Sequence, residues 1–466
     1  MENFKDLQDR MSALLSGLNV DYAEIRTENT RDLNIAYSGT KLERVRRTAV
    51  IGGNVRALHK GGWGFVAFSN LDELEAGVKL AVEQAHAAGE VLQEKSQLAD
   101  VPVVVEDVVP IWNMHPETIS LDEKINQLGK YHKLMLSYPN TPSAWASLRE
   151  TCSTITFANS EGSCIRQEKV DFSFYLMPEA SKDGVSIDQF VSNGASDGMS
   201  KFFGLEEQIK EMCERTQILL DAPVVTEGVY TTICDPDLTG LFIHEAFGHL
   251  SEADDLVREP DFLKAMTLGR KLGRPILNIY EVGDIITGRG YLKYDDEGVL
   301  AVNAPLVTEG VLSGRMNSRW SSAKLNEPVT GSARAMDYRF EPIVRMRSTC
   351  IAGGESSFED MIKDIKLGVY AVGGTGGQTN GEAFNFGASY GRMIRDGKLA
   401  EYVREVKLSG NVFTTMENID MIGNEAQGID GSGGCGKAEQ SPLPTSNITP
   451  HVRIQNVVIG GEPDED

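Results

Sequence analysis

Apolar and polar residues alternate along residues 21–68 with the period of two that is typical of β-strands. Turn-forming residues interrupt the alternation, so it predicts short strands at 21–27, 32–37, 42–48, 54–59 and 63–68. Apolar residues at helical spacing then predict amphipathic helices at 71–88, 121–137 and 205–220, with further strands between 143 and 177. This succession predicts an α+β fold whose helices pack on one face of an antiparallel sheet.

The N-terminal residues also follow a helical pattern, whose apolar side consists of Phe4, Leu7, Met11, Leu14, Leu15 and Leu18. The mixed charge around these residues indicates an amphipathic helix rather than a signal peptide. A stretch rich in Val and Pro at 100–110 indicates a connector or an edge strand.

The chain changes character after Asp221-Ala222-Pro223, which we take as a domain boundary. Beyond it, short strands joined by glycine turns predominate, for example at 306–316 and 393–402, and 357–367 is the clear helical pattern. The predicted organisation is an N-terminal mixed α/β domain with an antiparallel sheet (1–222), a β-rich C-terminal domain (223–461) and an acidic tail (462–466).

Candidate chemistry lies at the start of the second domain, in Leu241-Phe242-Ile243-His244-Glu245-Ala246-Phe247-Gly248-His249-Leu250. A strand at 228–233 precedes Asp235 and Pro236, which suit the cap and the first position of a helix. The common zinc-hydrolase pattern H-E-x-x-H sets its two His four residues apart on one helical face. Here they are five apart, roughly 140° around a regular α-helix. The helix is therefore expected to widen into a π-type turn, or to break near Gly248.

A metal site needs a third ligand, and Cys435 is our candidate. It lies in Gly428-Ile429-Asp430-Gly431-Ser432-Gly433-Gly434-Cys435-Gly436-Lys437, among glycines that allow close backbone approach, and thiolate is a good zinc donor. The oxygen-donor alternatives are Glu252 and Asp254, one turn past His249, although an acidic stretch is often simply solvated. The remaining cysteines have apolar surroundings typical of buried thiols: Cys152, Cys164, Cys213, Cys234 and Cys350.

Composition narrows the class of protein. The 466 residues include 45 Lys and Arg against 68 Asp and Glu, a formal charge of −23. Such a surface disfavours binding to nucleic acid and to anionic membranes, and no apolar run approaches the roughly 20 residues of a spanning helix. Six cysteines without paired spacing fit a reducing compartment. We therefore expect a cytoplasmic protein without nucleic-acid or membrane partners.

Two glycine motifs suggest other chemistry. Gly387-Ala388-Ser389-Tyr390-Gly391 matches the G-x-S-x-G nucleophile pattern, but a hairpin rather than a helix is predicted after it. The run Gly373-Gly374-Thr375-Gly376-Gly377 lacks the Lys-Ser/Thr ending of a phosphate loop. Close approach of a peptide backbone or of the metal-binding helix is the better explanation for these glycines.

Several segments in combination resemble the TldD/PmbA family of metalloproteases, on its TldD side: the H-E-x-x-x-H segment, the G-x-G-G-C-G-K segment, Asp295-Asp296-Glu297-Gly298, Gly376-Gly377-Gln378 and Gly423-Asn424. The resemblance extends from Gly61-Gly62-Trp63-Gly64-Phe65 to the last strand near Gly461. It implies zinc held by His244, His249 and Cys435, with Glu245 as the base. It also implies a subunit that forms a homodimer, or a heterodimer with a PmbA-type (TldE) relative, around a chamber that admits unfolded peptides. Leu250-Ser251 departs from the family, which often has Gly after the second His.

The predicted reaction is metal-assisted hydrolysis of peptides, with zinc holding a water that Glu245 deprotonates. Two other interpretations stay open. One is an amide hydrolase that uses Cys435 as the nucleophile with a motif His as its base. The other is a non-catalytic partner subunit of a heterodimeric protease.

Overall fold

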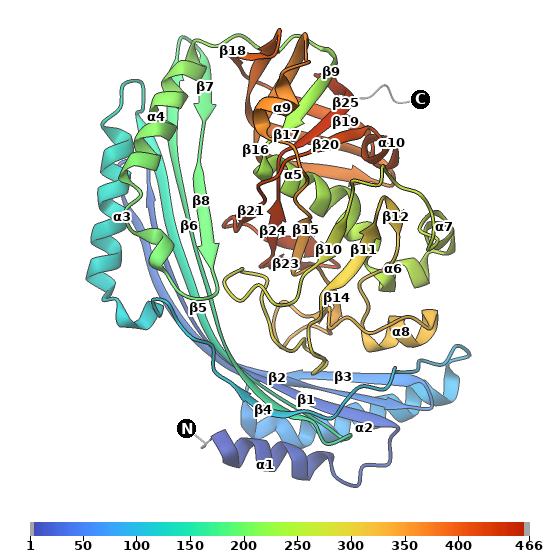
Figure 1. Cartoon of the computed structure of the whole chain (residues 1–466). Helices are drawn as coiled ribbons and strands as arrows, with labels where there is room; N and C mark the ends of the chain where they lie inside the picture. Colours follow the sequence, from blue (N-terminus) through green and yellow to red (C-terminus); the bar gives the residue numbers. More distant parts are fainter. Residues whose placement is uncertain (1–3, 461–466) are drawn as a thin grey trace.

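A computed structural model describes residues 4–460 of the chain (Figure 1). The predicted acidic tail at 462–466 lies outside the described residues. Among the described residues, no helix combines the length and the apolar character required to cross a membrane.

The first half of the chain is built on one eight-stranded sheet with the order β3-β2-β1-β5-β6-β4, in which β7 and β8 also pair with β6. Its strands are β1 (Tyr22–Ser38), β2 (Lys41–His59), β3 (Gly62–Phe68), β4 (Val105–Val108), β5 (Ser143–Asn159), β6 (Cys164–Lys182), β7 (Val185–Asp188) and β8 (Val191–Ala195). All pairs are antiparallel except β4 with β6. The predicted edge strand within 100–110 is therefore β4.

Four of the predicted short strands are in fact two long ones. The stretches 21–27 and 32–37 both belong to β1, and 42–48 and 54–59 both belong to β2. Pairing continues through the supposed turns, for example from Glu28 with Gly52 to Thr30 with Val50. Polar residues there line a surface of the sheet instead of ending the strand, and sequence alternation does not distinguish these two cases.

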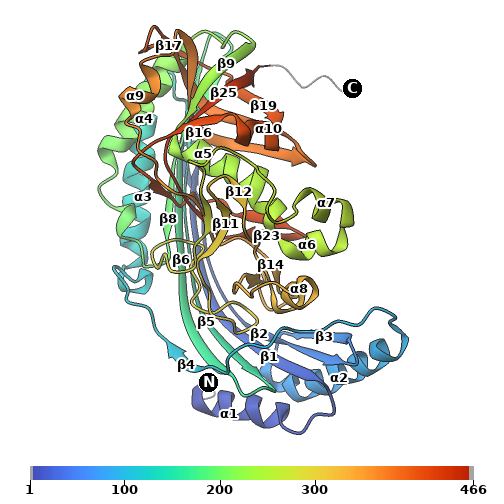
Figure 2. The same ribbon diagram turned by 45° about the vertical axis from the view of Figure 1, so that its right-hand side comes forward.

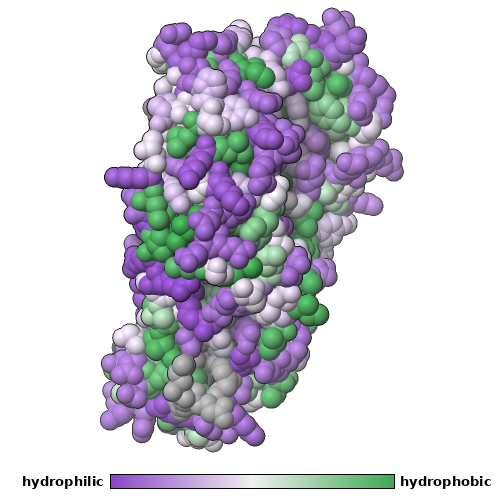
Figure 3. Space-filling view, turned by 90° about the vertical axis from the view of Figure 1, so that its left-hand side faces the viewer, coloured by the Kyte–Doolittle hydropathy of each residue, from purple (hydrophilic) through white to green (hydrophobic). Residues whose placement is uncertain are grey.

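Four helices cover the outer, convex face of the sheet (Figures 1 and 2). They are α1 (Phe4–Leu15), α2 (Leu74–Val91), α3 (Leu121–Leu136) and α4 (Glu206–Leu220), with short 3₁₀ turns η1 (Leu71–Glu73), η2 (Pro116–Thr118) and η3 (Ser200–Phe202). From α1, Leu7, Met11 and Leu15 are buried against the sheet, as its pattern predicts. The face over α3 and α4 mixes hydrophilic residues with small hydrophobic patches (Figure 3). The α+β prediction for this half is confirmed.

The second half lies against the concave face of that sheet (Figure 1). It holds a seven-stranded sheet, β16-β9-β25-β19-β17-β18 with β20 on β25, and a six-stranded sheet, β12-β11-β10-β15-β24-β21. The strands are β9 (Gly228–Cys234), β10 (Ile279–Glu281), β11 (Ala304–Thr308), β12 (Val311–Leu312), β13 (Ala333–Arg334), β14 (Ile343–Val344), β15 (Ser348–Ile351), β16 (Leu367–Asn380), β17 (Ala383–Arg395), β18 (Lys398–Val403), β19 (Lys407–Asn411), β20 (Ile419–Ile422), β21 (Gln427–Ile429), β22 (Cys435–Lys437), β23 (Gln440–Leu443), β24 (Ser446–Thr449) and β25 (Val452–Ile459). This half is β-rich, as predicted.

Helices in the second half are short and more frequent than the sequence pattern indicates. They are α5 (Pro236–Phe242), α6 (Ala253–Arg258), α7 (Pro260–Ala265), α8 (Arg319–Leu325), α9 (Phe358–Ile362) and α10 (Val412–Glu417). The helix expected at 357–367 is only α9, and Ser357 caps it through the backbone N–H of Asp360. The others have six or seven residues, too few turns to produce a recognisable helical period.

The two glycine motifs lie in neighbouring strands. Ser389 is inside β17, where no strand-to-helix elbow exists, and residues 373–377 are inside β16. A Cβ on Gly374 would lie 3.1 Å from the side chain of Leu241, in the helix that leads to the metal motif. The expectation that these glycines permit close approach is confirmed for Gly374.

Candidate metal centre

The helix that carries the metal motif has a well-defined start. Strand β9 ends at Cys234, and the Asp235 carboxylate accepts a hydrogen bond from the backbone N–H of Leu238 at 2.9 Å. Pro236 occupies the first helical position, where no N–H is required. The same carboxylate accepts the N–H of Gly373 in β16, so the cap also joins the helix to the sheet. Burial raises the pKa of Asp235 to about 7.

After Phe242 the α-helix turns into a π-helix, Ile243–Gly248, followed by one 3₁₀ turn from His249. The local widening expected from the five-residue spacing is therefore confirmed. A π-turn places residues five apart on the same side, and the rings of His244 and His249 lie with centroids 5.3 Å apart. Gly248 leaves room for the buried side chain of Met346, because a Cβ there would lie 2.1 Å from its sulfur.

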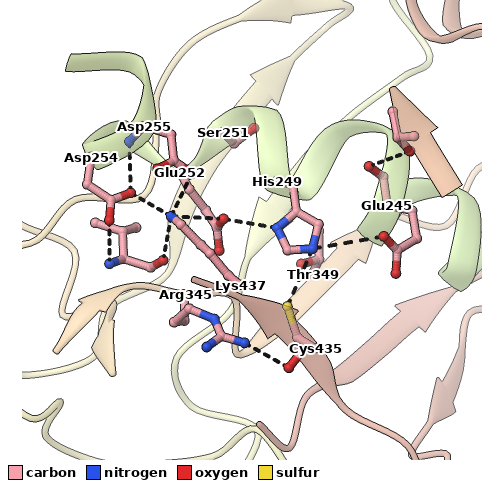
Figure 4. A network of polar contacts seen from close by, with 12 residues as sticks. Glu245, His249, Ser251, Glu252, Asp254, Asp255, Arg345, Thr349, Cys435 and Lys437 are labelled. Carbon is pink, nitrogen blue, oxygen red and sulfur yellow. Dashed lines mark hydrogen bonds and ion pairs between the residues drawn. The ribbon is translucent and has the colours of Figure 1, made fainter. Parts of the chain in front are cut away.

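Cys435 is brought to this helix by the β22–β23 hairpin (Figure 4). Its Sγ lies 3.5 Å from Nε2 of His249, although 186 residues separate the two in the chain. Three possible ligand atoms, a ring nitrogen of His244, a ring nitrogen of His249 and the Sγ of Cys435, all lie within 4.8 Å of one another. Zinc bonds of about 2.0–2.3 Å in tetrahedral geometry place donors about 3.4–3.8 Å apart, so a small contraction closes this set around one ion. Two imidazoles and a thiolate fit zinc.

The oxygen-donor alternatives lie elsewhere. Glu252 is fully buried and its carboxylate accepts a hydrogen bond from Nδ1 of His249 at 3.0 Å, on the ring edge away from Cys435. Asp254 accepts the N–H of Val344 and pairs with Lys437 at 2.7 Å. Glu252 therefore orients the imidazole, an arrangement common around metal-binding histidines.

Lys437 connects the two segments of the site and was not singled out from the sequence. Its ammonium lies 3.2 Å from Glu252, 2.7 Å from Asp254 and 2.9 Å from Asp255 (Figure 4). Two features of the sequence indicate such a role for Lys437: it lies two residues after Cys435, and an acidic run follows His249. Their pairing could not be read from the sequence, because it depends on how two remote segments meet.

Electrostatics in the site favour a thiolate. Burial alone would raise the pKa of Cys435, but hydrogen bonds and charge from His244 and His249 lower it to about 6. Burial likewise opposes the charged form of His249, and the partners Cys435 and Glu252 outweigh it, raising its pKa to about 10. Thiolate is the form of Cys that binds metals and attacks electrophiles.

Glu245 lies beside this set and remains partly open to solvent. Its carboxylate is 3.9 Å from Nε2 of His249, and its side chain is 30 % exposed. Its backbone carbonyl accepts a hydrogen bond from Oγ1 of Thr379 in β16. After the motif, Leu250 packs on the core of the second half and the Ser251 hydroxyl donates to the carbonyl of Phe247.

The other five cysteines are outside this cluster. Four are buried and Cys164 is half-buried. Burial raises the pKa of Cys152, Cys213 and Cys350 to about 12, and it also raises those of Cys164 and Cys234. They are unreactive thiols, as their apolar contexts indicate.

Three family models match the chain: PmbA/TldA metallopeptidase domain 1 at residues 23–88, the central domain at 115–220 and the C-terminal domain at 227–461. A metalloprotease of Synechocystis is 36% identical, with 95% of each chain covered. One of Methanothermobacter thermautotrophicus is 35% identical over 98% of this chain and 97% of its own. A zinc metalloprotease TldD homolog of Saccharolobus solfataricus is 28% identical, covering 88% of this chain and 90% of its own.

Solved structures share the fold at low sequence identity. TldE from Thermococcus kodakarensis aligns with a TM-score of 0.76 and 17% identity, over 98% of this chain and 99% of its own. A putative modulator of DNA gyrase from Thermotoga maritima aligns with a TM-score of 0.77 and 17% identity, over 98% of this chain and 100% of its own. Matched along nearly its whole length by metalloproteases and by all three family models, this chain belongs to the TldD/PmbA family of metallopeptidases.

Proposed function

We propose that the chain is a zinc-dependent peptidase that hydrolyses small or unfolded peptides, with the metal held by His244, His249 and Cys435 and Glu245 as the general base. One observation carries this proposal: three donor atoms from two remote segments converge within 4.8 Å. Bound zinc supplies a Lewis acid that polarises the scissile carbonyl and lowers the pKa of water. The name of the Saccharolobus relative, a zinc metalloprotease, supports the choice of metal.

In this proposal the chain's own groups divide the remaining work. The Glu245 carboxylate, partly exposed and beside His249, takes a proton from the attacking water and delivers it to the leaving amine. The Glu252 carboxylate holds the His249 ring through Nδ1, which leaves Nε2 free to bind metal. Lys437 holds Glu252 and the Cys435 strand in register.

We further propose that residues 223–461 form the metalloprotease domain and that residues 1–222 form the wall of a substrate chamber and take part in dimerisation. The partner is a second copy or a TldE-type relative, and TldE of Thermococcus kodakarensis supports the second choice through its shared fold. The acidic charge of −23 argues against nucleic-acid partners and fits a cytoplasmic protein.

Metal analysis combined with Glu245→Gln tests the proposal. The purified protein is expected to hold about one zinc per active chain, to lose peptide cleavage with a chelator and to recover it with zinc. Glu245→Gln should keep the metal and lower kcat by at least 10²-fold, the usual contribution of a general base. Cys435→Ala should lose the metal. Normal cleavage by Glu245→Gln would show that Glu245 is not the base.

A second candidate function is favoured by the thiolate at Cys435, whose pKa is lowered to about 6 beside two imidazoles. A thiolate beside an imidazole is also the form in which a catalytic cysteine attacks its substrate. In that case an alkylating agent inactivates the protein in excess chelator, and activity does not depend on zinc. Activity that disappears with chelator and returns with zinc excludes it.

A further inference from the structure

A cavity of about 570 Å³ lies between the concave face of the large sheet and the second half of the chain. Strands β1, β5 and β6 form one wall, and the segment before β22 together with strand β23 forms part of the other. This volume falls within the range of 300–1,000 Å³ that is usual for ligand sites. No residue of the metal set lines it.

The cavity is strongly charged and slightly positive, on a chain whose net charge is −23. Its lining includes five acidic residues and six basic residues, namely Arg26, Arg149, Lys169, Arg289, Arg334 and Arg339. Most of the acids already have a cationic partner: Arg26 pairs with Glu28 and Asp296, Arg289 with Asp171, and Arg339 with Asp337. The charges left without a carboxylate partner are therefore mainly cationic.

Lys169 and Arg334 are the clearest of these uncompensated cations. Within residues 4–460, the Lys169 side chain makes no hydrogen bond or ion pair, and Arg334 donates only to the carbonyls of Met346 and Pro444. Burial lowers the pKa of Lys169 to about 8, and repulsion from Arg334 is the next cause. Burial also lowers the pKa of Arg334 to about 10. An anion bound beside Lys169 and Arg334 would offset the cost of burying their charges and would reduce the repulsion between them.

Arg149 adds a third such cation. It is exposed on β5 at the cavity and, in the described part of the chain, forms no ion pair or side-chain hydrogen bond. Its charge acts on Asp171, which is already paired with Arg289. The site can therefore accept an anion without breaking an existing pair.

The cavity is joined to the metal centre through the chain itself. Gly433 lines the cavity two residues before Cys435, a separation of at most about 7 Å along the backbone. Arg289 donates to the carbonyls of Gly431 and Gly433, which holds this segment against the sheet. The cavity wall and the candidate metal ligand Cys435 are therefore separated by no more than the length of a few peptide residues.

We propose that this cavity binds a carboxylate of the peptide substrate, with Lys169 and Arg149 as specificity-determining residues and Arg334 behind them. The inference rests on the peptidase function proposed above. A single carboxylate on an otherwise neutral peptide fits better than a polyanion, because five acidic residues share the lining and the whole chain repels extended negative charge. The carboxylate is either the C-terminal one or that of an Asp or Glu side chain.

Three forms of one glycine–alanine decapeptide, each with an uncharged fluorophore on its N-terminus, test the proposal: a free C-terminal acid, a C-terminal amide, and an amide with Glu as its last residue. We expect the protein to cleave at least one carboxylate form with about tenfold higher kcat/KM than the plain amide, as a charge-assisted hydrogen bond predicts. Preference for the first form assigns the C-terminal carboxylate, and preference for the third assigns a side chain. Equal values for all three forms overturn the proposal.

Lys169→Met should remove this preference, lowering kcat/KM for the preferred form about tenfold and leaving the plain amide unchanged. Lys169→Arg keeps the charge and should keep the preference. Lys79→Met, which removes an exposed charge on the outer helix α2, is the matched control and should behave as the parent protein. The fold should tolerate Lys169→Met because no ion pair is lost. Equal losses for acid and amide forms in Lys169→Met contradict a carboxylate site.

Binding can be measured without turnover. Fluorescence anisotropy of the same labelled peptides with Glu245→Gln should give about tenfold tighter binding of the preferred carboxylate form than of the plain amide, and Lys169→Met in that background should equalise them. If no peptide is cleaved but this difference is present, the peptidase proposal fails and the carboxylate site stands. Equal affinities overturn the site whatever the cleavage result.

Discussion

At the level of single residues, the candidate site is organised by a carboxylate and a lysine that lie outside the proposed ligand set. Glu252 holds His249 at Nδ1, and Lys437 neutralises Glu252 while its own strand carries Cys435 (Figure 4). Groups that orient a metal ligand typically change metal affinity 10–100-fold when they are removed. The chemistry therefore depends on more than the motif residues.

Replacing Lys437 tests this dependence. Lys437→Met leaves Glu252 and Asp254 buried without their cation, so we expect zinc affinity to fall about 10–100-fold in a competition titration with a chromophoric chelator. Lys437→Arg should recover part of the loss. Lys363→Met, which removes an exposed pair with Asp360, should leave zinc affinity unchanged. Unchanged affinity in a folded Lys437→Met protein would rule out the positioning role.

At the level of the element, the helix that carries His244 and His249 begins with a well-formed N-cap and then departs from α-helical geometry. The Asp235 cap and Pro236 begin α5, and the π-helix then turns His244 and His249 to one side. The cap is itself unusual, because burial raises the pKa of Asp235 to about 7 and outweighs its two backbone hydrogen bonds. The folded protein therefore holds a proton there that the unfolded chain releases.

Asp235→Asn should change how stability depends on pH. Between pH 3.8 and about 7 the folded state binds more protons at Asp235 than the unfolded state, so its contribution to stability falls as pH rises through this window. Asn also caps helices and carries no charge. We expect Asp235→Asn to gain stability relative to the parent protein as pH rises from 4 to 7, by about 1–3 kcal/mol in urea unfolding. A constant difference across this range would contradict the shifted pKa.

At the level of the whole molecule, buried ion pairs connect the concave sheet to the second half. Arg26 pairs with Asp296 at 2.8 Å, and Arg56 bonds Glu24 at 2.6 Å and Glu297 at 3.1 Å. Asp296 and Glu297 belong to a loop of the second half, whereas both arginines come from the sheet. The cavity therefore depends on the contact between the two halves, whereas the candidate metal ligands all lie within the second half.

Arg56→Met tests this connection. Removing one partner leaves the Glu24 and Glu297 carboxylates buried without a cation, so we expect a loss of about 3–5 kcal/mol in the free energy of unfolding. Adding Glu297→Gln should restore part of it. Arg395→Met, which removes an exposed pair with Glu401, should cost at most about 1 kcal/mol. Similar losses for Arg56→Met and Arg395→Met in denaturant unfolding would contradict the proposed connection.

Part of the fold and of the site was predictable because it depends on local sequence. Spacing predicted helices α2, α3 and α4. The five-residue interval between His244 and His249 predicted either a π-type turn or a break near Gly248, and the structure contains the π-turn. The glycines around Cys435 marked that thiol as different from the others. Such features can be recognised in the sequence because residues within one helix or strand follow a regular backbone geometry, which sets the spacing of their side chains.

The pairing of remote segments was not predictable in the same way. The length of β1 and β2, the short helices α6 to α8, the partners of Lys437 and the charged cavity all depend on contacts between positions far apart in the chain. A carboxylate that is solvated in one fold orients a histidine in another, and its local pattern is the same in both. The linear chain thus determined residue types and local periods. Tertiary structure decided the distances between side chains far apart in the sequence, and with them burial and charge balance, because these distances depend on how remote segments pack within each half and between the two halves.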